Sequence, residues 1–104
     1  VALGTDFPVE EIHPLSTFYA AVQRKNTDNE PLGGFNIEEG LTAKQTLMGM
    51  TKDAAFACRM DDRVGSLETG KLADFVILDR DIMVEKYMLE TKINATYLAG
   101  KKVN

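Results

Sequence analysis

Three side chains of this 104-residue sequence could take part in chemistry: Asp6, His13 and Cys58. Asp6 follows a short apolar run at residues 1–3, and a carboxylate there could accept a proton or bind a divalent cation. On local sequence alone, however, an aspartate after Gly-Thr is more often a turn or cap residue. His13 precedes Pro14, which favours a helix-entry role, and Cys58 lies on an apolar stripe where we expect a small buried core residue.

The residue counts exclude several classes of site. A single histidine excludes a His-pair metal motif within the chain and most Ser-His or Cys-His nucleophile schemes. A single cysteine excludes an internal disulfide framework and any Cys-rich zinc site. By these counts, the polypeptide is poorly equipped to be a complete enzyme.

The composition is typical of one globular domain, with 44% hydrophobic and 27% charged residues. The formal net charge of −4 argues against nucleic acid as a partner, because such proteins normally carry a basic stripe. No apolar run approaches the roughly 18 residues of a membrane span, so no span is expected.

The beginning of the sequence is unusual, because residues 1–4 are apolar and there is no initiator methionine. The run is typical of a buried strand that is entered partway along, followed by a turn. We therefore expect the chain to be a segment of a longer protein, and the alternative is a processed N-terminus.

A first helix is predicted from Pro14 to Arg24 or Lys25. Proline is favoured in the first turn of a helix, and one apolar face follows the helical spacing through residues 15, 18, 19 and 22. Residues 26–40 then form a long loop. Phe35, an aromatic residue in its middle, indicates that the loop is ordered and packs against other residues.

A second helix is predicted over residues 43–59. Thr42 and Gln45 match a capping box, which satisfies backbone amides at the start of a helix. Apolar residues then widen one face over three turns, so we expect this helix to be buried over more than half of its circumference.

The last third of the chain changes to a strand period. Residues 64–71 form a turn-rich link, and residues 73–79 read as a strand covered on both faces. A short helical turn at 84–89 and a hairpin around Gly100, between residues 93–98 and 102–103, complete the prediction. The chain divides near residue 61, and the charged residues around it (Arg59, Asp61, Asp62 and Arg63) read as a solvated helix-end cluster.

Three stretches together resemble the metal-dependent amidohydrolases. Gly4-Thr5-Asp6-Phe7-Pro8-Val9 is similar to the end of their eighth barrel strand, and residues 41–55 to the helix that follows. Residues 64–79, with the pattern G-S-[LI]-E-x-G-K-x-A-D-[FL]-V-[IV]-L-D, resemble their link into a C-terminal β-domain and are the most specific feature. Within the superfamily, the chain looks most like the D-aminoacylase-like and exoenzyme-regulatory-protein-like branch.

The resemblance implies an α/β fragment of a larger fold. Residues 1–60 would be the last strand and following helices of a (β/α)8 barrel, and residues 61–104 the C-terminal part of a flanking β-sandwich. A whole barrel needs about 250 residues, so this chain could supply only part of one. The family's other metal ligands, most of them histidines, lie on earlier strands and cannot be present here.

The resemblance also assigns the chemistry to Asp6. In the full-length parent, Asp6 would bind zinc or another divalent metal, take a proton from the metal-bound water and return it to the leaving amine. The substrate would be a small-molecule amide or N-acyl compound. Phe35 and Asn36 could overhang the pocket, whereas Asp74 is better explained as a structural turn or cap residue.

Two alternative functions stay open at this stage. The segment could be an independent binding or interaction module, or its parent could keep the fold and regulate rather than hydrolyse. As an isolated piece, it is expected to bind no metal, to be inactive and to self-associate, most simply as a twofold dimer.

Overall fold

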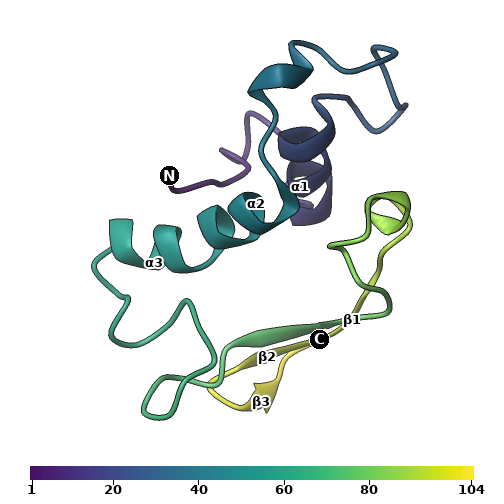
Figure 1. Ribbon diagram of the computed structural model, residues 1–104. Helices are drawn as coiled ribbons and strands as arrows, with labels where there is room; N and C mark the ends of the chain where they lie inside the picture. The colour runs from purple at the N-terminus through teal and green to yellow at the C-terminus, as the bar shows by residue number, and fades with distance from the viewer.

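The computed structural model describes all residues from Val1 to Asn104, and its helices and strands occupy different ends of the molecule (Figure 1). The elements in chain order are α1 (Pro14–Gln23), η1 (Ile37–Glu39), α2 (Ala43–Met50), α3 (Lys52–Ala57), β1 (Phe75–Leu78), η2 (Glu85–Tyr87), β2 (Ile93–Leu98) and β3 (Lys101–Lys102). The mixture of helices with one sheet confirms the α/β class. The barrel, the sandwich and the division near residue 61 stay predictions.

Helix α1 confirms the first predicted helix. Pro14 occupies its first turn, where the missing N–H costs no hydrogen bond, and His13 is the N-cap. The helix ends at Arg24, which adopts a left-handed conformation with φ of 55° and donates its N–H to the carbonyl of Ala20. The predicted end was therefore correct to within two residues.

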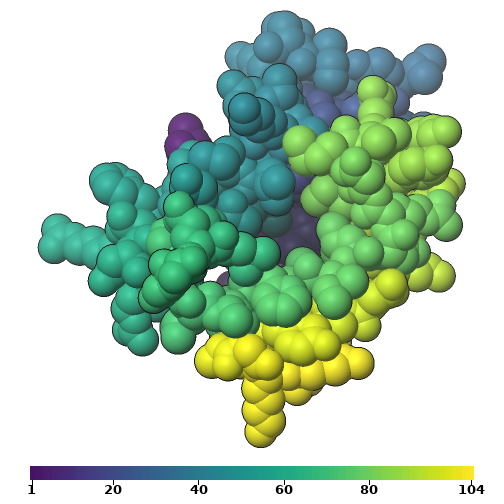
Figure 2. Space-filling view, turned by 60° about the horizontal axis from the view of Figure 1, so that its bottom comes forward, coloured from purple at the N-terminus to yellow at the C-terminus, as the bar shows by residue number.

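The core joins α1 to the segment around η2. Phe18 and Tyr19 of α1 are buried together with Ile82 and Met88, which flank η2. These four residues come from both ends of the sequence, so the apolar face of α1 is covered by a segment more than 60 residues away. In the space-filling view a recess separates this light-green segment from the teal helices (Figure 2).

The predicted helix over residues 43–59 is wrong in one respect, because it is broken into α2 and α3. The capping box is confirmed: the Thr42 side chain accepts the Gln45 N–H and the Gln45 side chain accepts the Thr42 N–H. At Thr51 the backbone leaves the helical region, with φ of −125° and ψ of −86°. The Thr51 hydroxyl donates to the Leu47 carbonyl at 2.6 Å, and such side-chain bonding competes with the helical ladder.

The expected burial of these helices is also wrong. Leu47 is 40% exposed and Phe56 is 72% exposed, whereas the buried positions are Thr46, Gly49 and Ala55. The other elements of the chain cover only the side of the helices that carries these smaller residues. Leu47 and Phe56 therefore face open surface, whereas Met50 packs against the core.

The sheet has the strand order β1-β2-β3 and is antiparallel throughout. Phe75 pairs with Tyr97, and their rings stack with centroids 4.7 Å apart. The turn between β2 and β3 contains Gly100, with φ of 78°, which confirms the predicted hairpin. The helical turn predicted at 84–89 is present as η2.

Two expectations about strands are wrong. Residues 1–4 form no strand, because they pair with none of the three strands and Leu3 instead donates its N–H to the Gly49 carbonyl of α2. Strand β1 is not covered on both faces, since Val76 is 50% and Ile77 45% exposed. None of the helices has the length and apolar character that a bilayer crossing requires.

Candidate functional site

Asp6 lies in a tight turn that follows the extended residues 1–4. Its φ is 53°, a left-handed conformation that aspartate tolerates better than most residues, and its carbonyl accepts the Val9 N–H at 2.9 Å. The residue is exposed, and its carboxylate makes no hydrogen bond or ion pair within the chain. The carboxylate is therefore free to interact with a ligand or a proton.

The residues of this chain do not form a metal site by themselves. No three side chains among the histidine, the cysteine and the acids come together in a way that could hold an ion. Zinc requires three or four protein ligands, and Asp6 could supply one carboxylate. Any metal bound at Asp6 would need its other ligands from residues outside this chain.

His13 is at the entrance of α1, as the sequence predicts. It is exposed, and its side chain makes no capping hydrogen bond. Its position is explained by the helix start, and the structure gives it no partner residues for metal binding.

Phe35 and Asn36 lie in the long loop, which is ordered by contacts with Arg24. The Phe35 N–H donates to the Arg24 carbonyl at 2.8 Å, and Arg24 Nε donates to the Phe35 carbonyl at 3.0 Å. The Arg24 guanidinium also lies 5.9 Å from the centre of the Phe35 ring. The expectation of an ordered loop is therefore confirmed.

A polar hollow of about 660 Å³ lies between the turn of Asp6, α1 and this loop. Thr5 and Phe35 both line it, so the loop and the residue before Asp6 border the same hollow. Asp6 and Asn36 are not among its lining residues. The full lining is Gly4, Thr5, Glu10, Glu11, Ser16, Thr17, Ala20, Arg24, Lys25, Asn26, Thr27 and Phe35.

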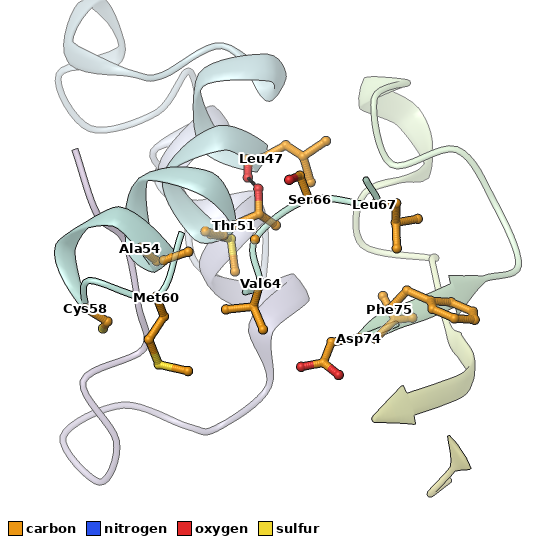
Figure 3. A pocket seen from close by; sticks show the side chains of 14 residues that line it. Leu47, Thr51, Ala54, Cys58, Met60, Val64, Ser66, Leu67, Asp74 and Phe75 are labelled. Atoms are coloured by element: carbon orange, nitrogen blue, oxygen red, sulfur yellow. Dashed lines mark hydrogen bonds between the residues drawn. The ribbon is translucent and has the colours of Figure 1, made fainter. Parts of the chain in front are cut away.

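A second hollow, also about 660 Å³, is apolar and lies between the α2–α3 helices and β1 (Figure 3). Leu47, Met60 and Leu67 line it, and Cys58 borders it beyond α3. The expectation that Cys58 is a buried core residue is wrong, because the residue is exposed at the C-cap of α3. The stripe on which it lies is apolar, but no element of the chain covers it.

Asp74 has the structural role expected from the sequence. Its side chain accepts the backbone N–H of Ala99 at 2.7 Å, which ties the start of β1 to the hairpin turn. The charged residues near position 61 are exposed, and none of the ion pairs in the structure involves them.

Ser66, Glu68 and Lys71 form a polar cluster that the sequence analysis missed. The Ser66 hydroxyl donates to Glu68, while Lys71 Nζ donates to the Ser66 hydroxyl at 2.8 Å and lies 3.0 Å from the Glu68 carboxylate. The hydrogen bond from Ser66, followed by the hydrogen bond and charge of Lys71, holds the pKa of Glu68 below its ordinary value. The sequence does indicate this cluster, because all three residues occur within one short link. The link turns at Gly65 and Gly70, both of which have positive φ.

Comparison with known proteins identifies the chain's relatives. A family model described as "Amidohydrolase family" matches residues 1–104. The chain is 36% identical over 104 residues to Protein LONG AFTER FAR-RED 3 of Arabidopsis thaliana, with 99% of the chain and 18% of that protein covered. It is 30% identical over 102 residues to N-substituted formamide deformylase of Arthrobacter pascens, with 96% of the chain and 18% of that protein covered. It is 33% identical over 106 residues to imidazolonepropionase of Desulfotalea psychrophila, covering 100% of the chain and 23% of that protein.

The chain thus spans about a fifth of the length of the curated relatives it matches. No solved structure matches it significantly. The narrower resemblance to the D-aminoacylase-like branch stays a prediction. The match of the family model over the full 104 residues is nevertheless decisive, and the chain belongs to the amidohydrolase family.

Proposed function

We propose that these residues are part of a hydrolase that cleaves a non-peptide C–N bond of a small amide or N-acyl substrate. The observation that carries the proposal is the family match over residues 1–104. Two relatives bear the names of a deformylase and of imidazolonepropionase, which supports hydrolytic chemistry in the full-length protein.

In this proposal, Asp6 is the residue of the chain that takes part in the reaction. Its carboxylate is exposed and unpaired, so it could accept a proton from the attacking water and return it to the leaving nitrogen. Asp6 would also be one ligand of a divalent metal such as zinc in the full-length protein, provided that the other ligands come from outside this chain.

The experiment is the substitution Asp6→Asn in a full-length protein that contains these residues. Asparagine keeps the volume and removes the proton-accepting oxygen, so turnover should fall about 10²-fold or more while the fold is retained. Asp61→Asn is the matched control, because Asp61 is also exposed and unpaired but lies beyond α3. Turnover by the Asp6→Asn protein at the wild-type rate would show that Asp6 has no such role.

The second function, a non-catalytic regulatory or interaction module, gives a different result in the same experiment. A full-length protein without measurable hydrolysis of amides, N-acyl compounds or N-substituted formamides, in the presence of zinc, would contradict the proposal and favour this alternative.

A further inference from the structure

The break between α2 and α3 leaves the Gly49 carbonyl without its helical partner and free to bind another segment. In a continuous helix the Gly49 carbonyl would accept the N–H of Asp53, four residues later. In this structure that bond is not formed, and the Gly49 carbonyl accepts the N–H of Leu3 at 2.9 Å. The segment that leads into Asp6 is therefore fastened to the end of α2.

Thr51 satisfies the two carbonyls that precede Gly49. Its hydroxyl donates to the Leu47 carbonyl at 2.6 Å, and its N–H donates to the Met48 carbonyl at 3.2 Å. The last carbonyls of a helix need partners from outside the helical ladder. The Leu47 and Met48 carbonyls are thus satisfied locally, whereas the Gly49 carbonyl is the one that accepts a bond from a second segment, at Leu3.

The absence of a side chain at position 49 lets the segment approach this closely. A Cβ atom there would lie 2.8 Å from the Leu3 side chain and 2.8 Å from the carbonyl oxygen of Val1. Glycine is unfavourable inside a helix, so its presence at a buried position of α2 calls for a local reason. The close contact with residues 1–3 provides that reason.

We infer that Gly49 is a positioning residue for Asp6, acting through Leu3. Asp6 lies only three positions after Leu3, so a displaced Leu3 moves the start of the turn that presents the carboxylate. The consequence for catalysis rests on the proposed function, whereas the contact itself can be tested on this 104-residue chain.

The contact is tested by amide hydrogen exchange, measured by NMR on the chain. Gly49→Ala should make the Leu3 amide exchange at least about tenfold faster, because the added methyl group separates the two segments. Gly4→Ala is the matched control, since a Cβ at Gly4 meets no atom within 4 Å. The Arg24 amide, bonded to Ala20, reports that the rest of the fold is unchanged. An unchanged Leu3 amide in Gly49→Ala, or an equal loss of protection in Gly4→Ala, overturns the inference.

A second variant avoids any added volume in α2. Thr51→Ala removes the hydroxyl that bonds to Leu47, which favours a continuous helix in which the Asp53 amide takes the Gly49 carbonyl. The Leu3 amide should then exchange faster while the Asp53 amide exchanges more slowly. If Leu3 stays protected although Asp53 becomes protected, the Gly49 carbonyl does not hold the segment.

The catalytic consequence is tested by a double-mutant cycle in a full-length protein. Gly49→Ala should lower kcat about tenfold, since small displacements of a reacting group are costly, and should lower it no further in the Asp6→Asn background. An equal loss in both backgrounds would mean a general structural effect and would overturn the positioning role. If Asp6→Asn alone keeps wild-type turnover, the proposed function fails, and the Leu3 exchange experiment still decides the contact.

Discussion

Asp74 Oδ1 accepts the backbone N–H of Ala99 at 2.7 Å, a bond that spans 25 positions of the sequence. Next to it, the Gly100 N–H donates to the Ala73 carbonyl at 2.9 Å. Together these bonds fix the turn of the β2–β3 hairpin to the residues that precede β1. Asp74, an acidic residue of the type often used in catalysis, therefore has a structural role in the sheet.

Asp74→Ala should lower the free energy of unfolding by about 1 kcal/mol, because it removes the charged acceptor that holds the exposed Ala99 N–H at the hairpin turn. Urea unfolding monitored by circular dichroism measures the change. Asp61→Ala is the control and should cost less than about 0.5 kcal/mol, since Asp61 is exposed and unpaired. Equal effects of the two substitutions would show that the Asp74–Ala99 bond does not contribute measurably to stability.

Thr42→Ala should destabilise the chain by about 1 kcal/mol, because it removes one half of the capping box at the start of α2. The same unfolding measurement applies. Thr27→Ala, at an exposed loop position whose side chain makes no hydrogen bond, is the control. A loss of stability no larger than that of the control would contradict the role of the cap.

The Glu68 carboxyl should titrate below the range of an ordinary glutamate, since Ser66 and Lys71 favour its charged form. A lowered pKa in the folded state means that this cluster stabilises the fold above the unfolded-state pKa, and that the contribution disappears as pH falls through the lowered pKa. Ser66→Ala should raise the pKa of Glu68 toward its ordinary value, as followed by NMR of the carboxyl carbon. Ser16→Ala is the control and should leave the pKa of Glu68 unchanged. If Ser66→Ala also leaves this pKa unchanged, the Ser66 hydrogen bond does not lower it.

The 104-residue chain should bind zinc no better than about millimolar and should hydrolyse no amide or ester, because Asp6 can offer only one ligand. Calorimetric titration and a turnover assay measure these two properties. Stoichiometric micromolar binding that is lost in Asp6→Asn would contradict this prediction.

The chain should self-associate at micromolar concentrations, most simply as a twofold dimer. Phe56 is 72% exposed and Val76 50%, and β1 is a sheet edge without charged residues, whereas β3 at the other edge consists of two lysines. Light scattering over a concentration series measures the mass, and Val76→Lys should reduce the association. A concentration-independent monomer of 11.5 kDa would contradict it.

The features that the sequence predicted well depend on residues close together in the chain. Pro14 begins α1, Thr42 and Gln45 cap α2, and Gly100 forms the hairpin turn, each through geometry contained within a few residues. Such local signals need no knowledge of the tertiary contacts.

The features that the sequence missed depend on competition or on distant contacts. At Thr51 the helical hydrogen bonds compete with a bond from the side-chain hydroxyl. The apolar pattern of residues 47–58 does not predict that this competition breaks the helix. Cys58 and Leu47 lie on an apolar stripe, but a stripe does not specify what covers it. Likewise, the Gly-Thr-Asp sequence predicts the turn at Asp6, whereas the bond from Leu3 to the Gly49 carbonyl of α2 could not be predicted.

The contacts between Arg24 and Phe35 have a consequence for how the sequence can change over evolutionary time. They bring the two ends of the segment 25–34 together independently of its tip, where Leu32 is 96% exposed. Lengthening a loop whose ends are already joined is inexpensive, at about 0.6 kcal/mol for each doubling. Insertions between Leu32 and Gly33 should therefore be accommodated without disturbing α1 or the turn that carries Asp6, because a side chain at Gly33 would meet no atom within 4 Å.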